Sequence, residues 1–125
     1  MKVPPLCVAL PAGPSHRYVA RYRVSPGGRP DVLAPPRLVP PDASLGDRDD
    51  VLVAVDMDGT EADAAATERG ASAVPRLGDA LLRLGTARLA AGDADDAAEL
   101  VPAYVTLPRG LSPAVAEREW SPDLR

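Results

Sequence analysis

The first half of the chain carries short apolar runs, separated by turn residues, of the kind that form buried β-strands. Residues 6–10 are one such run, which ends at the turn sequence Pro-Ala-Gly-Pro. Residues 51–55 are another, with three valines among five apolar residues, and this composition is typical of a central strand covered on both faces. The pattern therefore predicts a sheet with the 51–55 strand in its middle.

Strict alternation marks the segment between these runs. In residues 18–24 the aromatic and small side chains point to one side, and Arg21 and Arg23 point to the other. We interpret this segment as a half-buried antiparallel strand whose arginine face is solvated. Residues 31–39 can return beside it after the turn sequence Ser-Pro-Gly-Gly, but their two consecutive prolines confine them to a sheet edge.

Two helices are expected after residue 58. Thr60 and Asp63 have the spacing of a capping box, so a short helix should begin at this turn and end at Gly70. Residues 75–91 predict the longest helix of the chain, with Gly92 as its C-terminal cap.

The longer helix carries a leucine stripe and two glycines. Leu77, Leu81 and Leu84 recur at spacings of four and three, which predicts a buried apolar face. Gly78 and Gly85 lie seven residues apart on nearly the same side and weaken the helix. They indicate either close approach by another backbone or a locally lax helix.

The last expected element is a strand over residues 101–108, bounded by prolines and including Pro102 and Tyr104. Strands first and helices later predict an α/β or α+β domain: a mixed sheet with a hairpin and one or two packed helices. We assign this domain to residues 1–110 and a polar tail to residues 111–125.

Composition limits the core that these elements can build. The chain has 125 residues and 13.0 kDa, which suits one small domain. Hydrophobic residues make up 46%, but aromatic residues only 3% with no Phe, so the core must consist of Ala, Val and Leu. Such a core is thin.

Charge and cysteine content narrow the choice of partners and compartment. The net charge is −4, and eight acids face one base between residues 42 and 63, so direct tRNA binding is not expected. The single cysteine, Cys7, cannot form an internal disulfide and fits a reducing cytoplasm. No apolar stretch approaches the roughly 20 residues of a membrane span.

The sequence Asp-Met-Asp-Gly-Thr after residue 55 is a candidate catalytic motif. It resembles the motif of haloacid-dehalogenase-type phosphatases, in which Asp56 would attack phosphorus, Asp58 would protonate the leaving group and Thr60 would hold the phosphoryl group beside magnesium. Those enzymes need a later lysine, whereas the only lysine here is Lys2. We favour a turn that ends a strand and caps a helix, and keep a small magnesium-dependent phosphatase as the alternative.

A second resemblance covers more of the chain, about residues 16–110. In order, the pieces are a strand YVARY, a return strand ending LVPP, a valine strand ending in Asp-Gly, and a helix ALLRLGTARLAAGD that leads into LVPAYVTLP. This order resembles the C-terminal half of the TsaB (YeaZ) family. That family is the dimerization subunit of the bacterial complex that makes threonylcarbamoyladenosine next to the tRNA anticodon.

The resemblance implies half of a ribonuclease-H-like, actin-like (ASKHA) fold without catalysis or a cofactor of its own. It implies an accessory role through contacts with the large threonylcarbamoyltransferase subunit, and with an ATPase subunit of the complex as a second partner. The contact residues that we expect lie on the longer helix and the last strand: Leu77, Gly78, Leu81, Leu84, Gly85, Pro102 and Tyr104. The family's N-terminal half is missing here, so we also expect uncovered apolar surface and self-association.

Overall fold

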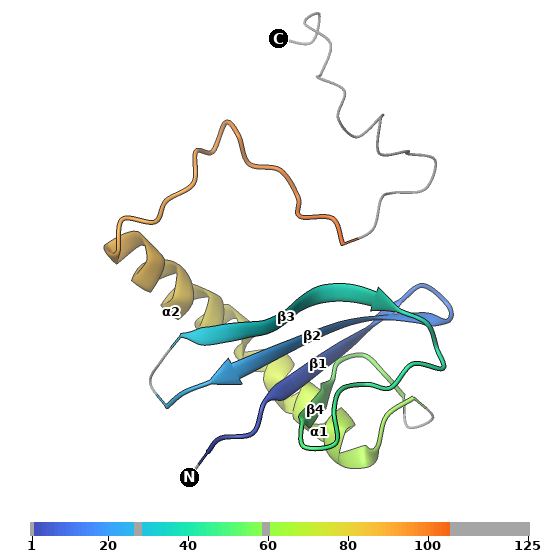
Figure 1. Ribbon diagram of the computed structural model, residues 1–125. Coiled ribbons are helices and arrows are strands. Elements are labelled where there is room, and N and C mark those ends of the chain that lie inside the picture. Colours follow the sequence, from blue (N-terminus) through green and yellow to red (C-terminus); the bar gives the residue numbers. More distant parts are fainter. Residues whose placement is uncertain (1, 27–28, 59–60, 106–125) are drawn as a thin grey trace, which may run out of the picture.

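The computed structural model describes residues 2–26, 29–58 and 61–105 and shows a small mixed α/β domain (Figure 1). Four strands form one sheet in the order β3-β2-β1-β4, and helices follow the last strand along the chain. The elements are β1 Leu6–Ala12, β2 His16–Val24, β3 Pro30–Val39, β4 Val51–Ala54, α1 Ala64–Ala73, the 3-10 turn η1 Val74–Arg76 and α2 Leu77–Ala90.

The predicted hairpin is confirmed, and so is the edge position of its second arm. β2 pairs antiparallel with both β1 and β3, and β3 ends the sheet. Across β2 and β3, Val19 faces Arg37 but Arg21 faces Ala34, so β3 holds one extra residue where its two prolines lie. Because proline cannot donate to a ladder, the strand bulges there instead of ending.

β4 is an edge strand, and the prediction of a central strand over residues 51–55 is wrong. β4 pairs only with β1, in parallel, and Val51 and Val53 stay half-buried. Its inner face packs on α1, where Arg69 Nη1 donates to the Leu52 carbonyl at 3.0 Å. An apolar run predicts that a strand is buried, but it does not determine which strands pair with it.

The core lies on one side of the sheet, between the strands and α1, and is as thin as the composition predicts. Val19 and Cys7 are its largest fully buried side chains. Arg17, Arg21 and Arg23 point to this same side as Val19, so the arginine face of β2 is not the solvated side that we expected. The core cluster comprises Cys7, Ala9, Val19, Val39, Ala54, Met57 and Ala66.

Helix α1 begins later and ends later than predicted. Its N-cap is Asp63, whose side chain accepts from the Ala66 amide at 2.7 Å, whereas Thr60 lies outside the described residues. Gly70 does not end the helix: a Cβ placed there would come within 1.7 Å of the Ala54 carbonyl oxygen. The glycine is therefore the point where α1 meets β4.

Helix α2 is exposed, and the predicted buried stripe is wrong. Leu77, Leu81 and Leu84 are 57%, 61% and 40% exposed, and the helix has no buried residue. Open space surrounds the Cβ positions of Gly78 and Gly85, so no described residue makes a close approach there. Gly92 with φ of 78° ends the helix as predicted.

The chain after α2 forms no strand over the described residues 91–105, which contradicts the predicted strand for its first five residues. Figure 1 shows this orange segment arching away from α2 on the side of β3. The rest of the predicted strand and the tail over residues 111–125 lie outside the described residues. Within the described part of the chain, no helix is long and apolar enough to cross a membrane.

Candidate functional site

The most extensive candidate surface is the leucine-bearing side of α2. Besides Leu77 and Leu81, the side chains of Leu82 and Leu89 are 71% and 67% exposed. At about 100° per residue these leucines form two rows, and Gly78 and Gly85 fall between the rows. The helix thus presents a broad apolar arc with a shallow, side-chain-free centre.

The opposite part of α2 faces the domain. Ala80, Leu84 and Ala87 line a hollow of 670 Å³ whose other wall is formed by Val24 and Pro26 at the turn between β2 and β3. Ala80 is the only half-buried residue of α2. The domain therefore covers the alanine side of the helix loosely and leaves the leucine arc to solvent.

Pro102 and Tyr104, expected to share a surface with α2, lie on the irregular segment after it. Tyr104 is 65% exposed, and Figure 1 shows this segment on the β3 side, away from α2. The structure places Leu77, Gly78, Leu81 and Gly85 on the exposed side of α2, but it turns Leu84 toward the hollow beside the domain and does not bring Pro102 and Tyr104 beside them.

The aspartates of the phosphatase-like motif form a turn. Asp56 has a φ of 54°, which aspartate tolerates better than most residues, and its side chain is exposed while Met57 is buried. The Asp58 carbonyl accepts from the amides of Glu61 and Ala62 at 3.1 and 3.3 Å, which leads the chain toward the Asp63 cap. The turn interpretation accounts for these contacts.

A metal-binding group would need further ligands near these aspartates. Over residues 2–26, 29–58 and 61–105, no group of three or more His, Cys, Asp or Glu side chains is placed to hold a metal ion. Thr60, the remaining residue of the motif, lies outside the described residues.

An ion-pair cluster between β2 and the loop before β4, in which only the Asp50 side chain is buried, was not predicted. Arg21 Nε and Nη2 donate to the two Asp50 carboxylate oxygens at 2.7 and 2.8 Å, and Asp47 lies 2.8 Å from Nη2. The hydrogen bonds from Arg21 lower the pKa of Asp50, and in return Asp50 raises the pKa of Arg21. Beneath them, burial raises the pKa of the Cys7 thiol, which keeps it protonated and unreactive.

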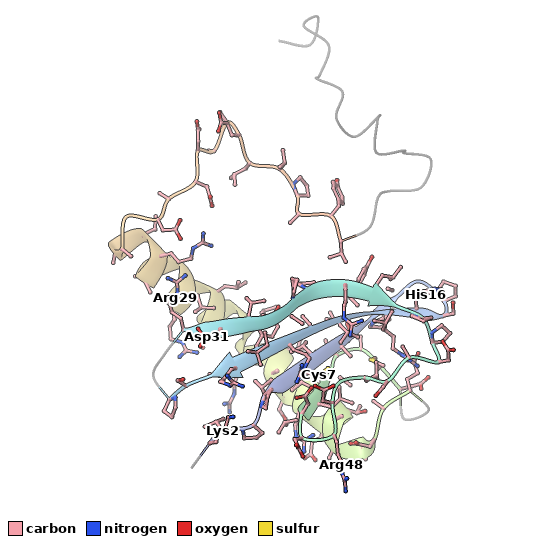
Figure 2. The ribbon with its side chains drawn as sticks, in the orientation of Figure 1. Lys2, Cys7, His16, Arg29, Asp31 and Arg48 are labelled. Carbon is pink, nitrogen blue, oxygen red and sulfur yellow. The ribbon has the colours of Figure 1, made fainter. Side chains whose placement is uncertain are left out.

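Further polar side chains lie at the two ends of the sheet. Figure 2 shows His16 at the turn between β1 and β2, and Arg29 and Asp31 at the opposite end of the strands. His16 is exposed, and its Nδ1 lies 3.1 Å from the hydroxyl oxygen of its neighbour Ser15. It lies at the other end of the sheet from Lys2 (Figure 2).

Comparison with known proteins assigns no family to this chain. No protein-family model matches the chain, and neither a curated protein nor a solved structure is significantly similar to it.

Proposed function

We propose that this chain is a non-catalytic docking module that recruits a partner protein through α2. The observation that carries the proposal is the leucine arc: four large apolar side chains, each more than half exposed, stand on a helix that the domain covers only on its alanine side. Exposed apolar surface of this kind is costly in water and is typical of protein–protein contact sites.

The two glycines support helix-to-helix docking. Gly78 and Gly85 lie between the leucine rows with nothing within 4 Å of their Cβ positions. A partner helix can therefore approach the α2 backbone closely while its own side chains pack between the leucines. The close approach predicted from the sequence is then made by another protein and not by this chain.

The resemblance to the TsaB family supplies the partner. We propose the large threonylcarbamoyltransferase subunit as the protein that α2 binds, with an ATPase subunit as a further member of the assembly. The mixed sheet with its antiparallel hairpin supports the proposal that the domain is half of an actin-like fold. In this role the Asp56–Asp58 turn is scaffold, and the chain acts on tRNA modification only through the subunits that it holds.

The experiment is co-elution of this chain with the large subunit, measured by size-exclusion chromatography with light scattering. Leu81→Glu places a charge in the leucine arc and should weaken the complex at least about tenfold, because truncated or charged hot-spot positions lose roughly 2 kcal/mol. Ala90→Glu is the matched control, because it adds the same charge at an exposed position of the same helix, outside the leucine arc.

A shared peak that Leu81→Glu removes and Ala90→Glu keeps supports the proposal. If the unmodified chain shares no peak with the large subunit, that subunit is not its partner, even if the chain self-associates when run alone. Equal binding by both variants would show that the complex forms through another surface.

A further inference from the structure

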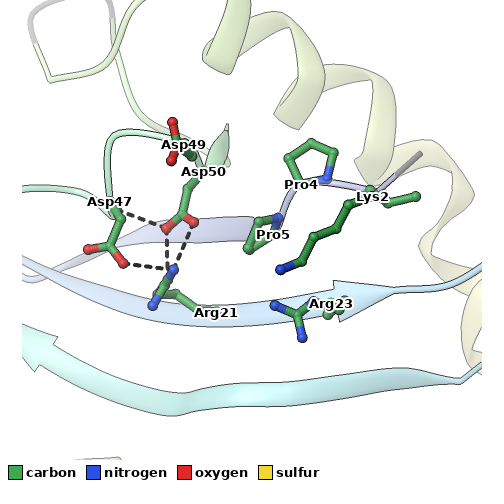
Figure 3. A pocket seen from close by; sticks show the side chains of 9 residues that line it. Lys2, Pro4, Pro5, Arg21, Arg23, Asp47, Asp49 and Asp50 are labelled. Atoms are coloured by element: carbon green, nitrogen blue, oxygen red, sulfur yellow. Dashed lines mark hydrogen bonds and ion pairs between the residues drawn. The ribbon is translucent and has the colours of Figure 1, made fainter.

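A second hollow, of 380 Å³, lies between the start of β1, the end of β2 and the loop before β4 (Figure 3). It is separate in chemistry from the apolar surface of α2, because six of its lining residues are charged: Lys2, Arg21, Arg23, Asp47, Asp49 and Asp50. A volume of this size falls in the range of small-ligand sites.

The charges in this hollow are unevenly paired. Arg21 is neutralised by the two-bond contact with Asp50 and by Asp47. Lys2 and Arg23 form no ion pair with any residue in the described part of the chain. Figure 3 shows these two side chains pointing into the same end of the hollow, while Asp49 stands beyond Asp50 at the other end.

Arg23 also has a buried hydrogen-bond donor without an acceptor. Its Nε atom is shielded from solvent and meets no hydrogen-bond partner among the described residues. An unsatisfied buried donor destabilises the fold, and it does so more strongly when it is charged. Two cations that face one space without an ion-pair partner among the described residues define a place where an anion's oxygens would be stabilised.

We propose that this hollow binds a small ligand through one anionic head group, a phosphate monoester or a carboxylate, held by Arg23 and Lys2. The ligand's oxygens accept from the Arg23 guanidinium, and Lys2 supplies the second charge. Asp47 and Asp49 at the other end repel an extended polyanion, so a nucleic-acid strand does not fit the same site. This ligand site does not depend on the docking role of α2.

The test is an NMR titration that follows the Arg23 Nε–H signal in the full-length chain at constant ionic strength. Inorganic phosphate and acetate are the probes, and chloride is the reference salt. We expect saturable shifts of this signal with phosphate or acetate. A stronger response to phosphate assigns the head group as a phosphate ester, and a stronger response to acetate assigns it as a carboxylate.

Variants separate a site from general charge screening. Arg23→Gln should weaken binding at least tenfold. Because this variant lacks the Arg23 Nε–H signal, binding is followed by the shifts of the neighbouring backbone amides. Arg48→Gln, which removes the same charge from an exposed position outside the hollow, should leave binding unchanged. Lys2→Gln, at an exposed position, should also weaken binding and serves if Arg23→Gln does not fold.

Two results overturn the proposal: chloride producing the same shifts as the probes, or Lys2→Gln and Arg23→Gln binding as well as the unmodified chain. Neither result bears on α2, since co-elution with a partner protein is measured on another surface.

Discussion

At Gly70 the absence of a side chain lets helix α1 touch strand β4 directly. A Cβ there would lie 1.7 Å from the Ala54 carbonyl oxygen and 2.5 Å from its carbon, and these are backbone atoms that cannot rotate aside. We therefore expect Gly70→Ala to destabilise the fold by about 3 kcal/mol or more, the upper range for overpacked cores. Urea unfolding followed by circular dichroism measures this loss.

Gly78 provides the matched control for that substitution. It is also a helical glycine, but nothing lies within 4 Å of its Cβ position. Gly78→Ala should raise the free energy of unfolding by about 0.5–1 kcal/mol through helix propensity alone. If both variants lose stability equally, the close contact between α1 and β4 is not what Gly70 provides.

At the scale of elements, local signals predicted the local structure. Alternation in β2, the proline pair in β3, the Gly92 cap and the valine run of β4 each identified an element that the structure contains. Two failures concern neighbours, because β4 lies at an edge and α2 is uncovered. A third is an element, because the strand expected from residue 101 does not form over the described residues up to 105. A hydrophobic pattern states that a face needs cover, but it does not state whether the same chain supplies that cover.

The candidate sites show the same difference between local patterns and tertiary neighbours. Leu77, Leu81, Gly78 and Gly85 were found from their spacing, because one helix carries them, whereas Leu82 and Leu89, which complete the arc, lie off that stripe and were missed. The pairing of Arg21 with Asp50, 29 residues apart, and the meeting of Lys2 with Arg23 depend on sheet register and on the path of a loop. No local pattern marks residues that only the tertiary fold brings together.

Helix α2 should be the least stable regular element of the domain. It has 14 residues and buries none of them, and isolated helices of about 12–15 residues are marginal in water. In hydrogen exchange followed by mass spectrometry, we expect α2 amides to exchange nearly as fast as an unstructured peptide, while β1 and β2 are protected up to global unfolding. Protection of α2 equal to that of β1 would contradict this view of the helix.

Partner binding gives the same measurement a second use. If α2 docks through its leucine arc, its amides should slow when the partner is present, because fraying then requires dissociation. The Leu81→Glu chain should show no such slowing.

At the scale of the whole molecule, the loop between β3 and β4 closes the core, and arginines from β2 hold that loop. Arg17 Nη1 donates to the Pro41 carbonyl at 2.9 Å near the start of the loop, and Arg21 binds Asp50 at its end. Between them Gly46 lies against Cys7, where an added Cβ would come 2.9 Å from the cysteine Cβ. A core of small residues thus depends on polar contacts at its rim.

This dependence predicts an acid-sensitive fold. Hydrogen bonds from Arg21 hold the pKa of Asp50 below the unfolded value of about 3.9, so the unfolded chain binds more protons at this site than the folded chain. The pair therefore contributes its full stability above about pH 5 and loses it as pH falls through the folded pKa. We expect Asp50→Asn to lower the free energy of unfolding by about 1–3 kcal/mol at pH 7.

The measurement that tests this prediction is the slope of the free energy of unfolding against pH. If Asp50 had only a structural role, Asp50→Asn would lower the free energy of unfolding by the same amount at every pH. Urea midpoints between about pH 7 and pH 3 should fall less steeply for Asp50→Asn than for the unmodified chain, since the carboxyl that takes up the proton is gone. Asp42→Asn removes an exposed carboxyl from the same loop and should leave the slope nearly unchanged. Parallel curves for the unmodified and Asp50→Asn chains would show that other carboxyls, and not the Arg21–Asp50 pair, set the acid limit of the fold.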